Sequence, residues 1–163
     1  MNARLRSAGI VAAVVVLDRI TKLYIQSAFS PLDMVEVIPG FFNIVHTENP
    51  GAAFGMLAQA PEEWRKFALV GLSVVVMGII GMMLFRPRTA ETVRTQTGLA
   101  LVLGGAMGNL WDRAVRGTVT DFLQFFFGSY EYPSFNVADS AICIGAGLLI
   151  LDLLLSRRAA PRQ

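Results

Sequence analysis

Only one cysteine, Cys143, and one histidine, His46, occur among the 163 residues of the chain. A single cysteine excludes an internal disulfide, and together the two residues cannot supply a zinc site of the usual ligand spacing. We therefore expect no metal and no other cofactor. The Gly-x-Ser-x-Gly pattern of serine hydrolases is missing, and no serine is marked out as a partner for Lys22 in a Ser–Lys hydrolase. Carboxylates remain as the candidate hydrolytic groups.

Charged residues are also scarce. They make up 16% of the chain against 54% hydrophobic residues, with a mean hydropathy of +0.54, whereas soluble domains carry roughly 25% charged residues. Uncharged runs such as Phe67–Phe85 are long enough to cross a hydrocarbon core about 30 Å thick. We predict a single domain over residues 1–163, a membrane all-α bundle of four transmembrane helices. Their expected ranges are about 7–25, 67–85, 95–111 and 137–155.

The N-terminal apolar segment has two interpretations. Arg4 and Arg6 before an apolar run also fit a cleaved signal peptide. However, Asp18, Arg19 and Lys22 follow where a small-residue cleavage site would lie. An uncleaved first helix is therefore favoured.

The arginines are distributed unevenly about the four predicted helices. One side of the bundle would carry Arg4, Arg6, Arg86, Arg88, Arg94, Arg157, Arg158 and Arg162. Because basic residues gather on the cytoplasmic side of a membrane, we expect a multi-pass protein with both termini in the cytoplasm. This asymmetry accounts for the formal net charge of +2, and no patch for nucleic acid is evident.

Two longer segments, about 26–66 and 112–136, should then lie outside. Residues 34–38 and 41–47 favour strands on either side of a Pro-Gly turn, which predicts a small extracytoplasmic β-platform. The segment 112–136 is rich in aromatic residues and is expected to be a loop. It is either an anchor in the headgroup region or a contact surface for a lipid-bearing substrate.

Asp121 and Asp139 lie where the apolar chain should leave and re-enter a bilayer. A carboxylate at that depth is costly, and it is usually paired, hydrated or functional. If Asn136 caps the fourth helix, Asp139 could complete a capping box, although the same helix end would also keep a functional carboxylate ionisable. Asp121 has no evident cap, and its nearest cation in the sequence is Arg116. Two such carboxyl groups could share a proton and activate water, as in an aspartic protease.

Other polar residues in the predicted helices have structural explanations beside functional ones. Asp18 and Lys22 are four residues apart, so they should form an ion pair on one helix face. Asp112 and Arg113 are a second candidate pair. Asn109 must find a hydrogen-bond partner within the membrane, either in the scaffold or in a substrate.

Small residues cluster in two places. Gly104–Gly108 has the small-xxx-small spacing that lets two helices approach closely. The run at residues 49–55 could let another backbone approach, or it could form only a turn.

Five stretches together resemble the lipoprotein signal peptidase (signal peptidase II) family. They are Leu17–Lys22, Asn49–Phe54, Gly108–Arg113, Gly117–Phe122 and Phe135–Ala141. Because they extend from the first to the fourth predicted helix, the resemblance covers nearly the whole chain. One departure is Pro50, where the family often has threonine, and it should stiffen a turn without touching the chemistry.

The resemblance implies a membrane aspartic endopeptidase of the bacterial inner membrane. It would remove signal peptides from diacylglyceryl-modified prolipoproteins, cutting before the lipidated cysteine, at a site toward the extracytoplasmic face. Asp121 and Asp139 would be the catalytic pair. Residues implied to hold substrate or scaffold are Asn49, Gly51, Asn109, Asp112, Arg113 and Asn136, with support from Asp18 and Lys22. We expect a monomer, with membrane phospholipid as its other partner.

A second interpretation is not enzymatic. Asp18, Asp121 and Asp139 could line a pathway through a small transporter or proton-conducting bundle. Four helices without internal symmetry make this the weaker interpretation.

Overall fold

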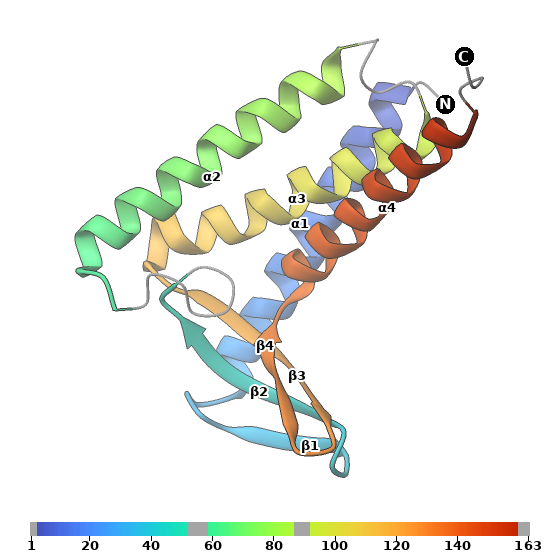
Figure 1. Ribbon diagram of the computed structural model, residues 1–163. Helices are drawn as coiled ribbons and strands as arrows, with labels where there is room; N and C mark the ends of the chain where they lie inside the picture. Colours follow the sequence, from blue (N-terminus) through green and yellow to red (C-terminus); the bar gives the residue numbers. More distant parts are fainter. Residues whose placement is uncertain (1–2, 52–58, 87–91, 160–163) are drawn as a thin grey trace.

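The structure, a computed structural model, describes residues 3–51, 59–86 and 92–159, and Figure 1 shows its four helices beside a small sheet. The helices are α1 (Ala3–Ala28), α2 (Glu62–Phe85), α3 (Val93–Arg116) and α4 (Val137–Ala159). The strands are β1 (Met34–Ile38), β2 (Phe42–Asn49), β3 (Val119–Phe127) and β4 (Tyr130–Phe135). A bundle of four helices with a small sheet is therefore confirmed, and each helix extends beyond its predicted core.

Helix α3 is the centre of the bundle, because α1, α2 and α4 all pack against it. Glycines make these approaches close. A Cβ atom on Gly104 would lie 2.9 Å from Cβ of Val14 in α1, and one on Gly105 would lie 2.4 Å from the carbonyl oxygen of Ala138 in α4. The predicted close approach at Gly104–Gly108 is confirmed, and it serves two neighbouring helices rather than one.

We expect the substitution Gly105→Ala to lower the melting temperature of the detergent-purified protein markedly. The added Cβ must displace the backbone of α4, and such overpacking costs about 1–3 kcal/mol or more. The matched control is Gly81→Ala in α2, where nothing lies within 4 Å of the added Cβ. An equal melting temperature for the two variants would show that α3 and α4 do not pack as closely as described.

The sheet is antiparallel with strand order β1-β2-β3-β4. The expectation that residues 112–136 form a loop is wrong, because α3 continues to Arg116 and a β3–β4 hairpin follows. Three consecutive phenylalanines, at positions 125–127, hide the alternation that normally signals a strand. Their rings help to join the strands, since Phe125 stacks on Phe42 with ring centroids 4.7 Å apart and on Phe135 at 5.8 Å.

The hairpin joins the bundle at two short junctions. Gly117 ends α3 in the left-handed conformation (φ 81°), which favours glycine, and the chain enters β3 two residues later. Asn136 alone separates β4 from α4. The sheet thus lies at the end of the bundle opposite the two termini (Figure 1), and the junctions place β3 and the start of α4 together.

Two of the helices have the length and apolar character needed to cross a membrane. Among the described residues these are Glu62–Leu84 and Val137–Ser156. The other two, α1 and α3, carry Asp18, Lys22, Asp112 and Arg113 of the site described below. That all four helices cross the membrane therefore stays a prediction.

Candidate active site

Asp121 in β3 and Asp139 in the first turn of α4 are both held by Asn136. The Nδ2 of Asn136 donates to Oδ1 of Asp121 at 2.7 Å, and its backbone N–H donates to Oδ2 of Asp139 at 3.3 Å. The N–H of Asp139 donates back to Oδ1 of Asn136 at 2.9 Å, which completes the predicted capping box. Asn136 is fully buried, so both carboxylates are hydrogen-bonded to one residue that is closed off from solvent.

Asp121 has two amide partners, which corrects the expectation that it lacks one. Besides Asn136, Nδ2 of Asn49 donates to its Oδ2 at 3.0 Å. The amide orientations follow from the other end of each group: Oδ1 of Asn49 accepts from the N–H of Gly51, and Oδ1 of Asn136 accepts from the N–H of Asp139. Each amide oxygen is thereby occupied, and each NH₂ group is left to face the carboxylate.

Asn109 holds the carboxylate of Asp139, and the orientation of its amide again follows from its other partners. Its Nδ2 donates to Oδ1 of Asp139 at 2.7 Å. Its Oδ1 accepts from Nζ of Lys22 at 2.9 Å and from Nδ2 of Asn136 at 3.3 Å. Because Lys22 can only donate, the oxygen must face it and the NH₂ group must face Asp139. Asn109 thus has scaffold partners, and a role toward substrate stays a prediction.

The surroundings of Asp121 favour its protonated form. Asp121 is 3% exposed. Burial, and after it the negative charge of Asp139, raises the pKa of Asp121 to about 7, although the hydrogen bonds from Asn49 and Asn136 act in the opposite direction. Near neutral pH the pair can therefore hold one proton between two carboxyl groups, the protonation state that aspartic peptidase chemistry requires.

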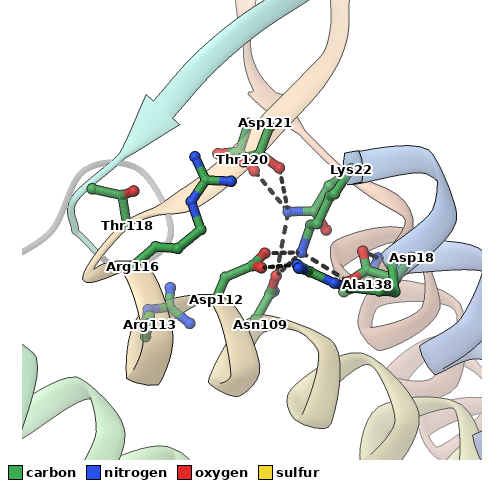
Figure 2. A network of polar contacts seen from close by, with 12 residues as sticks. Asp18, Lys22, Asn109, Asp112, Arg113, Arg116, Thr118, Thr120, Asp121 and Ala138 are labelled. Atoms are coloured by element: carbon green, nitrogen blue, oxygen red, sulfur yellow. Dashed lines mark hydrogen bonds and ion pairs between the residues drawn. The ribbon is translucent and has the colours of Figure 1, made fainter. Parts of the chain in front are cut away.

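A buried lysine, Lys22, belongs to the same polar network, and Figure 2 shows it among Asp18, Asn109 and Asp112. The side chain of Lys22 is fully buried, and its Nζ lies 2.9 Å from Oδ2 of Asp18 and 2.8 Å from Oδ2 of Asp112. The predicted Asp18–Lys22 pair is confirmed. Oδ1 of Asp18 also accepts from the N–H of Ala138 at 2.9 Å, so the same carboxylate joins α1 to the start of α4. A cation at this depth is tolerable only because two carboxylates and the amide of Asn109 surround it.

The predicted ion pair between Asp112 and Arg113 is wrong. Asp112 is paired with Lys22 and, at 3.2 Å, with Arg19. Adjacent residues on a helix point in different directions, so Asp112 faces α1 while Arg113 does not. Sequence proximity was misleading here because the true partners lie about 90 positions earlier in the chain.

Arg113 instead lies close enough to Asp139 and Asp121 for their charges to act on it. Its Nη2 donates to the carbonyl oxygen of Gly51 at 3.1 Å, and its charge interacts with Asp139, Asp121 and Asp112. Its Nε is buried, and within the described part of the chain it has no hydrogen-bond acceptor. Arg113 therefore presents a donor that a bound molecule could use.

A cluster around Glu48 supports the strand pair next to the site and was not identified from the sequence. Glu48 accepts from Thr118 at 2.6 Å, Thr120 at 3.0 Å and Arg116 at 3.1 Å, and one ring nitrogen of His46 lies 3.1 Å away. Burial alone would raise the pKa of Glu48, but these hydrogen bonds and the charge of Arg116 outweigh it and leave the pKa below its usual value.

The Glu48 cluster is next in sequence to two residues of the site. Glu48 directly precedes Asn49, and Thr120 directly precedes Asp121. The cluster therefore fixes β2 against β3 next to the Asn49–Asp121 hydrogen bond. The alternation of His46 with Glu48 was the available sequence signal, since alternate residues share one face of a strand.

The structure brings together every residue predicted for the site. Those residues are Asp18, Lys22, Asn49, Gly51, Asn109, Asp112, Arg113, Asp121, Asn136 and Asp139, and the contacts above connect each of them to the network. Residues 52–54, the end of one predicted motif, lie outside the described residues.

Known proteins resemble this chain along most of its length. The family model described as "Signal peptidase (SPase) II" matches residues 10–155. A protein of Solibacter usitatus named "Lipoprotein signal peptidase" is 45% identical over 159 residues, which cover 98% of this chain and 96% of its own length. A protein of the same name from Maridesulfovibrio salexigens is 46% identical over 89% of this chain and 93% of its own length.

Two solved structures also resemble the chain. Both are described as a bacterial membrane enzyme determined by the in meso method, one at 2.3 Å and one at 1.9 Å resolution. The first has a TM-score of 0.84 and 31% identity over 97% of this chain and 93% of its own. The second has a TM-score of 0.79 and 33% identity over 91% and 92%. With a family model that spans nearly the whole sequence and relatives this similar at full length, the chain belongs to the signal peptidase II family.

Proposed function

We propose that this chain is an aspartic endopeptidase that removes the signal peptide from diacylglyceryl-modified prolipoproteins, cutting before the lipidated cysteine. Its membership of the signal peptidase II family supports a peptidase, and the names of its relatives support prolipoproteins as substrates. The observation that carries the aspartic assignment is the pair Asp121 and Asp139, held by neutral amides around Asn136.

The chemistry follows from one shared proton. The ionised carboxylate takes a proton from water while the water oxygen attacks the scissile carbonyl carbon, and the protonated carboxyl gives its proton to the carbonyl oxygen. Collapse of the tetrahedral intermediate breaks the C–N bond, and the amine of the cysteine leaves with a proton from the pair. The raised pKa of Asp121 favours it as the resting holder of the proton, and the start of α4 stabilises negative charge on Asp139.

The scaffold residues would divide the remaining tasks. Arg113 has a buried Nε without an acceptor in the described residues, so it is suited to hold a carbonyl oxygen of the substrate. Asn49, Asn109 and Asn136 orient the two carboxylates. Gly51 would leave room for the peptide backbone beside Arg113.

We also propose that all four helices span the bacterial inner membrane, with both termini cytoplasmic and the sheet on the extracytoplasmic side. Two of the charges that make α1 look too polar lie inside the bundle, since Asp18 is 1% exposed and Lys22 is fully buried. The outer face of α1 exposes apolar side chains, including Val16, Leu17 and Ile20. Such a surface suits phospholipid, and a monomer is sufficient because one chain carries the complete site. Neither the family nor its relatives support the alternative of a transporter.

We expect kcat/KM for peptide cleavage to fall as the pH rises through about 7. Below this pKa Asp121 is protonated and can donate, whereas above it both carboxyls are ionised and no proton is left for the carbonyl oxygen. At the limit the loss is about tenfold per pH unit for a single required proton. The measurement is a pH series with a lipopeptide substrate that has no group titrating between pH 6 and 9. A flat profile over that range would remove the shared proton from the mechanism.

The diacylglyceryl group should dominate substrate recognition. Each buried methylene contributes about 0.8 kcal/mol, so two acyl chains outweigh the few polar groups offered by Arg113 and the asparagines. We expect the same peptide with an unmodified cysteine to be cut at least about 100-fold more slowly, measured as kcat/KM in matched micelles. Equal values of kcat/KM for the two peptides would show that the peptidase does not recognise the lipid.

A further inference from the structure

A cavity of about 680 Å³ lies away from the carboxylate pair, between α1, the C-terminal end of α2 and α3. Its polar and apolar linings are segregated. The polar residues are Arg4, Ser7, Arg86 and Gln96, and all four lie at the end of the bundle where the chain termini are found (Figure 1). From there toward Met107 the lining is apolar, with Val11 and Val15 among its residues. We call this cavity the α1–α3 groove.

The polar end of the groove is cationic. Arg4 and Arg86 line it, and no aspartate or glutamate does so within the described residues. A third arginine reinforces it, because Nη2 of Arg6 donates to Oε1 of Gln96. The Nε of Arg6 is buried, and no described residue accepts from it. The charge at this end therefore suits an anion.

The length of the groove suits an acyl chain. From Arg4 to Val15 the helix advances 11 residues, or about 17 Å at 1.5 Å per residue. One leaflet of a hydrocarbon core of about 30 Å has a thickness of about 15 Å. The volume also lies within the range of about 300–1,000 Å³ of ordinary small-molecule sites. The groove therefore has the layout of one lipid tail below one anionic headgroup.

We propose that the α1–α3 groove binds an anionic phospholipid from the leaflet nearest the chain termini. One acyl chain lies along α1 and α3 as far as Met107, and the phosphate contacts Arg4 and Arg86. This site takes a lipid that is neither substrate nor product, so it is independent of the peptidase function proposed above.

The test uses the full chain, purified in detergent and incubated with equimolar phosphatidylglycerol and phosphatidylcholine, with retained lipid counted by native mass spectrometry. A basic residue near an anionic headgroup contributes about fivefold to binding, so two should favour phosphatidylglycerol by roughly 25-fold. The double substitution Arg4→Gln/Arg86→Gln should abolish that preference. Arg94→Gln should preserve it, because Arg94 is paired with Asp152 of α4 and does not line the groove.

A second pair of variants tests the apolar part without changing charge. Ala12→Phe places a ring in the groove and should reduce retention of both lipids, whereas Ala13→Phe, at the neighbouring exposed position outside the lining, should not. Ala8→Phe, also in the lining, replaces Ala12→Phe if that variant fails to fold. Melting temperatures establish folding for each protein.

Several outcomes would overturn the proposal. One is equal retention of the two lipids by the unsubstituted chain. Another is that Arg94→Gln loses the preference for phosphatidylglycerol as fully as Arg4→Gln/Arg86→Gln does. Displacement of phosphatidylglycerol by inorganic phosphate would indicate a simple anion site without a role for the chain. Displacement by a substrate lipopeptide would assign the groove to the signal peptide instead. This alternative needs its own measurement because a second pocket, which shares Val15 and Met107 with the groove, leads on toward Arg19 and Trp111.

Discussion

Cleavage should be lost when either Asp121 or Asp139 is replaced by asparagine. An amide can neither take the proton from water nor deliver one to the carbonyl oxygen, and each such transfer contributes about 10²–10⁴-fold to the rate. Turnover of a diacylglyceryl lipopeptide should therefore fall by at least about that factor in each single variant. Asp33→Asn removes an exposed carboxylate from the same side of the molecule and should leave the rate unchanged.

The stability of the Asp121→Asn variant separates a catalytic role from a structural one. The pKa of Asp121 is raised by folding from 3.8 to about 7, so its ionisation opposes folding above pH 3.8 and does so fully above about pH 7. Removing the charge should leave the melting temperature at pH 8 equal to that of the unsubstituted protein or higher. If Asp139→Asn kept near-normal turnover, Asp139 would be only a helix cap and the catalytic pair would be wrong.

Replacing Lys22 by methionine should have the largest effect on stability. The change leaves the carboxylates of Asp18 and Asp112 buried without their central cation and removes the donor that orients Asn109. Breaking a buried pair in this way costs about 3–5 kcal/mol, so the melting temperature in detergent should drop steeply. Arg19→Met is the matched control, because Arg19 binds the same Asp112 from a partly exposed position and should matter far less.

A double substitution shows whether buried charge is the cause. Asp18→Asn/Lys22→Met removes one positive and one negative charge, and it leaves Asp112 with its remaining partner, Arg19. It should recover part of the stability lost in Lys22→Met, which gives a coupling between the two positions of the size seen for residues in one network. Additive losses would show that Lys22 acts through packing and not through its charge.

Local patterns in the sequence were sufficient for part of the site. The spacing of three between Asn136 and Asp139 predicted the capping box, and the spacing of four between Asp18 and Lys22 predicted their ion pair. Both contacts form within a single helix or at its end. The position of the helices could likewise be predicted, because uncharged apolar runs of that length are typical of helices that cross a membrane.

Contacts between distant segments could not be predicted from such patterns. Lys22 reaches Asp112 and Asn109 only because Gly108 lets α1 lie against α3; a Cβ there would be 2.5 Å from Oδ2 of Asp18. No spacing along the chain reveals that approach. The amides that hold Asp121 likewise come from β2 and from the start of α4, so the residue looked unpartnered in its own strand.

The most direct test of the proposed mechanism is the product mass after incubation of the purified protein with a diacylglyceryl-modified lipopeptide, compared with the Asp121→Asn/Asp139→Asn double variant. The mechanism predicts a single cut immediately before the lipidated cysteine by the unsubstituted protein, and intact substrate with the double variant. Cleavage at another bond, or the same products from both proteins, would contradict the assignment of Asp121 and Asp139 as the catalytic pair of a lipoprotein signal peptidase.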